Sequence, residues 1–259
     1  MKLPIYQIDA FAKNAFEGNP AAICPLDTWL PDEVLLSVAE ENNLSETAYF
    51  IKTNNGYHIR WFTPTTEVDL CGHATLAAAF VIFNELGYKE NSISFESKSG
   101  ILKIEKNNDL FIMDFPSQPP TTCELPAEIQ QAFNVVPTEC LKSEDYILVL
   151  NNENEVLNAK PKLGLLKNID RRGVIITAPS GNYDFVSRFF APKYGINEDP
   201  VTGSAHTQLA PYWANQLNQT KLHAKQVSKR GGELICELMG DRVTISGYAT
   251  KYLQGSIEI

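Results

Sequence analysis

The chain has 259 residues, of which 44% are hydrophobic and 20% are charged, and its formal net charge at pH 7 is −9. This composition excludes a disordered chain, and the length allows one large domain or two small ones. The acidic balance argues against a nucleic-acid partner, because binding to phosphates needs clustered Lys and Arg side chains.

The cysteines and histidines predict a cytoplasmic protein without a metal. Five cysteines form no Cys-x-x-Cys pair and are odd in number, which is typical of reduced thiols rather than of a disulfide scaffold. The four histidines show no zinc-binding spacing. The first residues read as a strand rather than a signal peptide, and the longest apolar run, 74–83, is about half of what a bilayer-spanning helix requires, so we expect no membrane partner.

The first half of the chain predicts strands, two helices and a hairpin. A helix begins at about Pro31, since proline is tolerated in a first turn, and Asn54-Asn-Gly56 is typical of a hairpin turn. The expected elements are strand 5–11, turn 17–20, helix 31–42, strands 47–52 and 57–62, helix 72–86 ending at Gly87, and strands 92–97, 101–106 and 110–115.

The second half repeats part of that order. Residues 121–170 give no clear pattern, and the expected elements after them are strands 172–178 and 184–190, helix 203–217, and strands 222–228, 233–238 and 242–248. The proline-rich stretch 116–120 predicts a boundary between an N-terminal lobe, 1–116, and a C-terminal lobe, 117–259, whose last strand is able to cross back to the first lobe.

Two matching segments indicate an internal duplication. Arg60-Trp-Phe-Thr-Pro64 and Arg188-Phe-Phe-Ala-Pro192 are each followed by a spacer, a Glu, and a glycine turn, Gly72 or Gly203, that opens an Ala-rich helix. The run 74–83 has no polar stripe, so its helix must be buried on most of its circumference. We therefore predict an α+β fold of two pseudo-symmetric lobes, each a curved, mostly antiparallel sheet wrapped around a central helix.

The glycine turns are candidate anion sites. The first N–H groups of a helix lack intrahelical acceptors and attract negative charge. If the two lobes face each other, both helix starts point into one cleft and hold a small carboxylate. His73, Asp199 and Ser204 lie at these turns and are candidates for proton transfer or hydrogen bonding; the alternative is a structural histidine at 73, a capping or turn residue at 199 and an N-cap at 204.

Cys71 and Glu46 give two further candidates. Racemases without cofactors can place one thiol on each side of a carbon acid, which makes Cys71 a candidate for a thiol-dependent racemase. The matching position in the second copy is Thr202, a poor base, so a two-cysteine mechanism is excluded. Glu46 lies at the edge of an apolar strand, where a carboxylate can abstract a proton near neutral pH; a surface role remains open for it.

Eight sequence blocks, in order along nearly the whole chain, resemble the PhzF-like (phenazine-biosynthesis-like) family, and most closely its phenazine-biosynthesis-like domain subgroup. The blocks are Asp9-Ala-Phe11, Gly18-Asn-Pro-Ala-Ala22, Asn43-Leu-Ser-Glu-Thr-Ala48, Arg60-Trp-Phe-Thr-Pro64, Leu70-Cys-Gly-His-Ala-Thr75, Arg188-Phe-Phe-Ala-Pro192, Glu198-Asp-Pro-Val-Thr-Gly-Ser-Ala-His206 and Arg230-Gly-Gly-Glu233.

This resemblance implies a diaminopimelate-epimerase-like fold, a homodimer, no cofactor and no metal. It also implies a cofactor-independent isomerase or epimerase that moves a proton on a small carboxylate-bearing carbon acid. The residues that correspond to the family's catalytic positions are Glu46, His73, Asp199 and Ser204, and those that line the pocket are Ser45, Gly72 and Gly203. The alternative from another class is a metabolite-binding or regulatory protein that has kept the site without turnover.

Overall fold

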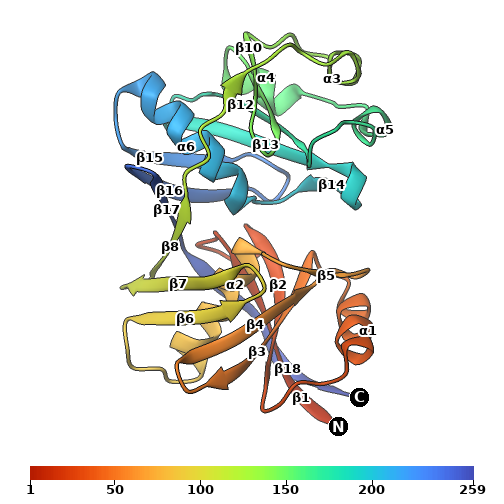
Figure 1. The fold of residues 1–259 in the computed structure, drawn as a ribbon, viewed down its shortest axis with the longest axis vertical. Helices are drawn as coiled ribbons and strands as arrows, with labels where there is room; N and C mark the ends of the chain where they lie inside the picture. Colours follow the sequence, from red (N-terminus) through yellow and green to blue (C-terminus); the bar gives the residue numbers. More distant parts are fainter. The chain divides into compact units, whose positions relative to one another are not determined.

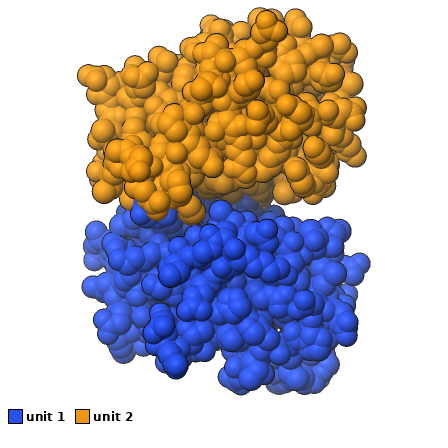
Figure 2. Space-filling model, viewed as in Figure 1, with its two compact units in different colours: residues 1–114, 246–259 blue, residues 115–245 orange.

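The computed structural model describes all residues, 1–259, and divides the chain into two compact units. Unit 1 consists of residues 1–114 and 246–259, and unit 2 consists of residues 115–245 (Figure 2). The sequence places the boundary after residue 116; in the structure the chain passes between the units within β8 (Leu110–Pro116) and again within β17 (Arg242–Gly247). No helix combines the length and the apolar character needed to cross a bilayer.

Unit 1 is a mixed sheet on which two helices pack, α1 on β3 and β4 and α2 on β1, β2 and β3 (Figure 1). Its elements are β1 (Lys2–Ala10), β2 (Asn19–Leu26), α1 (Asp32–Asn42), β3 (Glu46–Thr53), β4 (Gly56–Phe62), β5 (Glu67–Val68), α2 (Gly72–Phe80), a π-helical turn (Val81–Glu85), β6 (Ser92–Ser97), β7 (Gly100–Asn107), β8 and β18 (Ala249–Glu258). The strand order is β18, β1, β2, β3, β4, β6, β7, β8, with β2–β3 and β4–β6 parallel and the other pairs antiparallel.

The sequence pattern explains which faces of unit 1 are buried. In β4 the side chains of Tyr57, Ile59 and Trp61 are buried at every second position, the period of a strand with one face on a core. Residues 73–79 of α2 are all buried, as its lack of a polar stripe requires. Because α2 packs on β1, β2 and β3, its first turn lies beside the start of β3.

Unit 2 has its own helix-covered sheet. Its elements are β9 (Thr121–Thr122), α3 (Ala127–Ala132), β10 (Glu139–Lys142), β11 (Tyr146–Val149), α4 (Glu153–Asn158), α5 (Leu163–Leu166), β12 (Val174–Pro179), β13 (Phe185–Ala191), a 3-10 turn (Pro192–Tyr194), β14 (Ile196–Asp199), α6 (Gly203–Leu217), β15 (Lys221–Gln226), β16 (Gly232–Met239) and β17. The helix α6 packs on β15 and β16 (Figure 1).

The strand pairing of unit 2 repeats that of unit 1. The series β11–β12, β12–β13, β13–β15 and β15–β16 is parallel, antiparallel, parallel, antiparallel, the same alternation as in the series from β2 to β7. In both units the helix, α2 or α6, lies between the third and fourth strands of its series along the chain. The duplication seen in the sequence is therefore present in the topology.

The repeated Arg and Glu form matching ion pairs. Arg60 donates to both carboxylate oxygens of Glu67 at 2.8 and 2.9 Å, and Arg188 does the same to Glu198 at 2.6 and 3.0 Å. The Arg60 guanidinium holds the pKa of Glu67 down at about 2. Bidentate pairs of this kind are geometrically demanding, so they fix the segment before each glycine turn against its strand.

Three expectations about the elements need correction. The strand β2 was not predicted, because Pro20 and Pro25 argue against a central strand, yet it pairs with strands on both sides. The helix predicted at 72–86 is α-helical only to Phe80 and widens into the π-helical turn, although Gly87 does take a positive φ of 69°. Residues 121–170, which gave no clear pattern, hold three strands and three short helices.

Candidate functional site

The polar group of unit 1 begins with the turn before β2. Gly18 has a φ of 66°, and a Cβ at this position would lie 2.1 Å from the carbonyl oxygen of Ala10, so only glycine fits. The turn places Asn19 at the start of β2, where its side chain is fully buried. Its Nδ2 lies 3.4 Å from Nδ1 of His73, and its Oδ1 accepts a hydrogen bond from the Ser45 hydroxyl at 3.3 Å.

Glu46 and His73 meet at the centre of this group. Glu46 is the first residue of β3, His73 is the second residue of α2, and both are buried. Oε2 of Glu46 lies 3.1 Å from Nε2 of His73, within ion-pair distance. Apart from this ion-pair contact with each other, neither atom has a hydrogen-bond partner in the protein.

The surroundings of His73 favour the protonated form of its imidazole. Burial by itself lowers the pKa of His73, but the Cys71 sulfur and the Glu46 carboxylate raise it, and the net direction is well above its ordinary value. The Cys71 Sγ lies 3.5 Å from Nδ1 of His73. Burial and the charge of Glu46 raise the pKa of Cys71 by more than His73 and the Ala74 N–H lower it, so the thiol stays protonated at neutral pH.

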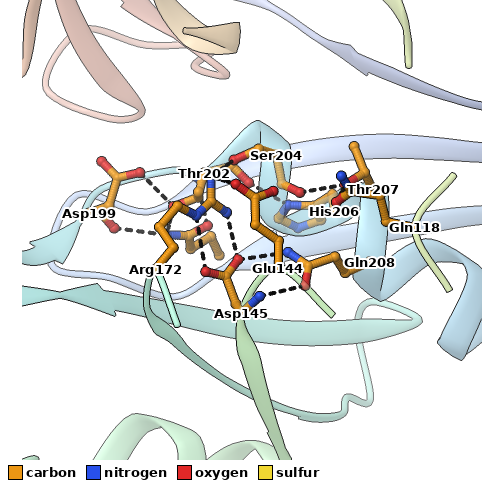
Figure 3. Close-up of polar contacts among 11 residues, drawn as sticks. Gln118, Glu144, Asp145, Arg172, Asp199, Thr202, Ser204, His206, Thr207 and Gln208 are labelled. Carbon is orange, nitrogen blue, oxygen red and sulfur yellow. Dashed lines mark hydrogen bonds and ion pairs between the residues drawn. The ribbon is translucent and has the colours of Figure 1, made fainter. Parts of the chain in front are cut away.

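The start of α6 in unit 2 is held by hydrogen bonds on several sides (Figure 3). The Thr202 hydroxyl donates to the Asp199 carboxylate at 2.5 Å, and the Thr202 N–H donates to the side chain of Gln226 at 2.8 Å. The Gln226 amide in turn donates to the Asp199 carbonyl oxygen at 2.8 Å. Asp199 is buried, and its neighbours fix it next to the first turn of α6.

Arg172 ties the same helix start to a buried carboxylate. It donates to both oxygens of Asp145, and its Nη1 donates to the Ser204 hydroxyl oxygen at 2.9 Å (Figure 3). Gln208, one turn further along α6, donates to Asp145 at 2.7 Å and accepts from the Asp145 N–H at 3.0 Å. Because Arg172 donates to Ser204, the Ser204 O–H is left to donate to another acceptor.

His206 is a buried, neutral histidine within α6. Its Nδ1 lies 2.9 Å from the Thr202 carbonyl oxygen, which can only accept, so Nδ1 carries the proton. Its Nε2 is buried without a hydrogen-bond partner. Burial lowers the pKa of His206 to about 4, although the Thr202 carbonyl acts in the opposite direction.

The residues predicted from the sequence fall into one group in each unit. Glu46, His73, Ser45 and Gly72 lie in the group of unit 1, with Ser45 connected through Asn19. Asp199, Ser204 and Gly203 lie at the start of α6 in unit 2. That both groups act on one molecule stays a prediction.

Sequence reasoning missed several polar residues. Asn19 belongs to a block quoted for the family resemblance, and its position in Gly-Asn-Pro was the signal available. Arg172, Asp145 and Gln208 had no usable signal, because they are far apart in the sequence and meet only through the sheet and α6. In unit 1, Glu46, Cys71 and His73 also bring three potential metal-ligand atoms within 4.8 Å of one another.

Comparisons with known proteins identify the family. The family model for phenazine biosynthesis-like proteins (PhzC-PhzF) matches residues 8–255. An uncharacterized isomerase of Pseudomonas aeruginosa is 48% identical over the full length of both chains. The crystal structure of a PhzF-family phenazine biosynthesis protein of Enterococcus faecalis is 46% identical, covers 100% of both chains, and superposes with a TM-score of 0.98.

The fold is shared more widely than the sequence. A hydroxyproline epimerase of Agrobacterium vitis, solved with trans-4-hydroxy-L-proline bound, is 9% identical and matches with a TM-score of 0.61 over 99% of this chain and 92% of its own. This likeness concerns the fold alone, and it confirms the expected α+β, epimerase-like architecture with its mostly antiparallel sheet. The chain belongs to the PhzF-like family of phenazine biosynthesis-like proteins.

Proposed function

We propose that this protein is a cofactor-independent isomerase or epimerase that moves a proton on a small carboxylate-bearing carbon acid. Two relatives that match this chain over its full length, at 48% and 46% sequence identity, are named isomerases. The more distant hydroxyproline epimerase of the same fold was solved with an imino acid bound. The observation that carries the proposal is the buried Glu46–His73 pair, 3.1 Å apart at the start of α2.

Glu46 is the proton-abstracting group in this proposal. Its buried Oε2 lies 3.1 Å from Nε2 of His73, and a carboxylate oxygen has a lone pair that can accept a proton from carbon. Once Glu46 is protonated, a proton can be delivered to a neighbouring carbon on the same face, from Glu46 or from His73 beside it; inversion at the same carbon would need a second donor on the opposite face. General acid–base help of this kind contributes on the order of 10²- to 10⁴-fold.

The helix starts supply electrostatic help. Neither α2 nor α6 has a side chain that caps its first turn, so N–H groups near Gly72 and Gly203 are available to a carboxylate or to the charge that develops on an enolate. We propose that Ser204, Asp199 and Gly203 bind and orient the substrate, with Arg172 as a positioning residue that directs the Ser204 hydroxyl. Ser45 and Asn19 hold the His73 ring.

The thiol-dependent racemase is the weaker alternative. A base must be deprotonated, and the pKa of Cys71 is raised. The position that matches it in unit 2 is Thr202, whose hydroxyl is engaged with Asp199. Activity that survives alkylation by iodoacetamide would remove this alternative.

Solvent deuterium exchange tests the proposal directly. Amino, imino and unsaturated carboxylic acids are incubated with the protein in D₂O, and incorporation at carbon is followed by NMR and mass spectrometry. We expect exchange at a carbon next to a carboxylate or conjugated with it, and its loss in Glu46→Gln. Ligand binding without exchange for every compound would favour the binding-protein alternative instead.

The homodimer and the cytoplasmic location stay predictions, which sedimentation and cell fractionation test.

A further inference from the structure

Three different kinds of ligand atom converge in unit 1. A carboxylate oxygen of Glu46, the sulfur of Cys71 and a ring nitrogen of His73 all lie within 4.8 Å of one another, and all three residues are buried. Glu46 comes from the start of β3, and the other two flank Gly72 at the start of α2. One oxygen, one nitrogen and one sulfur donor form a ligand set that zinc accepts readily.

Two of these atoms lack a good partner within the protein. Oε2 of Glu46 and Nε2 of His73 are buried and make no aligned hydrogen bond. Once His73 has lost its proton, a metal ion that accepts a lone pair from both atoms would give each of them a partner. Ligand atoms around tetrahedral zinc lie roughly 3–4 Å apart, given bonds of about 2.0–2.3 Å. The ligand atoms of Glu46, Cys71 and His73 lie within 4.8 Å of one another, so small rotations of these side chains would bring them to bonding distance of one ion.

The charge balance favours a divalent cation of zinc type. In a buried site the charge of Zn²⁺ would be matched by the Glu46 carboxylate and the Cys71 thiolate, with a neutral His73, so no net charge is buried. Mg²⁺ and Ca²⁺ prefer oxygen ligands only and would gain little from the sulfur and nitrogen. The spacing of ligands in the sequence did not show this set, because Glu46 is far from the other two along the chain.

We propose that Glu46, Cys71 and His73 bind one Zn²⁺ and that the bound ion blocks proton transfer. The blocking part rests on the proposed function: the lone pair of Glu46 that would take a proton from carbon is used to bind the metal. Zinc is therefore an inhibitor of this site, in contrast to a resident cofactor. Because the ligands must lose their protons, zinc binding releases protons and is tighter at higher pH.

Zinc binding is measured on the full-length protein after treatment with a chelator. We expect one Zn²⁺ per chain by competition with a chromophoric chelator and by calorimetry, and an affinity lower by on the order of 100-fold in Cys71→Ser. Co²⁺ serves as a spectroscopic probe, since it should give a thiolate charge-transfer band in the wild type and none in Cys71→Ser. Circular dichroism of both proteins establishes that the variant is folded.

Cys123→Ser is the matched control. Cys123 and Cys140 lie outside the proposed site with their sulfurs 3.5 Å apart, and removing one of them should leave zinc stoichiometry and affinity unchanged. A wild-type protein that binds no zinc, or zinc binding that is lost in Cys123→Ser and kept in Cys71→Ser, overturns the proposal.

The inhibition is measured as deuterium exchange with and without zinc. We expect the exchange rate to fall in proportion to zinc occupancy and to return when a chelator is added. If the chelator abolishes exchange and zinc restores it, the blocking role is wrong. If no compound exchanges under any condition, the proposed function fails, whereas the binding measurement still decides whether the zinc site exists.

Discussion

The starts of α2 and α6 occupy the same place in the two halves of the duplication, but their polar groups are satisfied to different degrees. At α6, Thr202, Ser204 and Asp145 all have aligned hydrogen-bond partners within unit 2. At α2, Glu46 and His73 lie 3.1 Å apart with buried atoms that no aligned bond satisfies. The hydrogen bonds at α6 fix Asp199, Thr202 and Ser204 in position, whereas the buried pair at α2 keeps lone pairs and protons available for chemistry.

The histidines of the two helices show the same difference. The pKa of His73 is raised through its contacts with Cys71 and Glu46, and the pKa of His206 is lowered to about 4 by burial without a charged partner. The start of α2 combines a buried carboxylate with a histidine whose pKa is raised, and the start of α6 holds a neutral histidine near the Arg172–Asp145 ion pair. We infer that the first does the chemistry and the second does the binding.

The largest expected effect comes from removing the carboxylate of unit 1. Glu46→Gln keeps the size of the side chain but cannot accept a proton from carbon, so we expect exchange to fall by about 10²- to 10⁴-fold. The measurement is the rate of deuterium incorporation into the best substrate found in the screen. Glu90→Gln, which changes an exposed glutamate in the same unit, is the control and should exchange at the wild-type rate. Equal rates in both variants would assign the base to another residue.

The second prediction concerns the free energy of unfolding and a variant in unit 2. Asp145→Ala removes a fully buried carboxylate, which is the bidentate partner of Arg172 and the acceptor of Gln208; Arg172 keeps Glu144, at 3.3 Å, as a carboxylate partner. Breaking a buried ion pair in this way costs about 3–5 kcal/mol of the free energy of unfolding. Urea denaturation monitored by tryptophan fluorescence measures it. Glu144→Gln is the neighbouring control: its side chain is 41% exposed, and we expect a change below about 1 kcal/mol.

Local sequence patterns were sufficient to predict the elements that depend on local chemistry. The helix 203–217 was predicted with its observed bounds from the glycine turn that opens an Ala-rich run, and in the structure Asn218 ends it in the left-handed region. The hairpin of β3 and β4 followed from Asn54-Asn55-Gly56. The strand β2 could not be predicted, since its two prolines are tolerated only through its particular neighbours in the sheet.

Local sequence patterns were limited in the same way when they were used to predict the site. Glu46 and His73 were found because their motifs place them at a strand start and a helix start. Their contact depends on α2 packing beside β2 and β3, which no local pattern specifies. Arg172 and Asp145 were missed for the same reason: a buried ion pair is created by tertiary structure, and either residue alone resembles any charged residue of a loop.

The third effect is a dependence of stability on pH that arises from His206. Its pKa is about 4 in the folded protein and 6.5 ordinarily, so between these values the unfolded chain binds a proton that the folded chain does not. Stability is therefore fully present above about pH 6.5 and falls as the pH decreases, by about 3 kcal/mol at pH 4. Urea unfolding between about pH 7 and pH 4 measures this loss.

Two variants isolate the contribution of His206 from that of the carboxylates. His206→Gln should lose less stability over the same pH range than the wild type, whereas His223→Gln, a change at an exposed histidine, should follow the wild type. Parallel pH profiles for all three proteins would show that His206 is not neutral in the folded state. NMR of the histidine rings should at the same time find His73 still protonated above its ordinary pKa.

The smallest effect separates binding from chemistry at the start of α6. Ser204→Ala removes the hydroxyl that Arg172 orients, and one neutral hydrogen bond is worth about 0.5–1.5 kcal/mol. We expect KM to rise by about 2- to 10-fold with kcat nearly unchanged, because the bond is made equally to the ground state and the transition state. Ser204→Thr keeps the hydroxyl and should keep KM close to the wild-type value. A variant whose kcat falls while KM stays constant would place Ser204 in the chemical step, and the division of labour between the two helix starts would then be wrong.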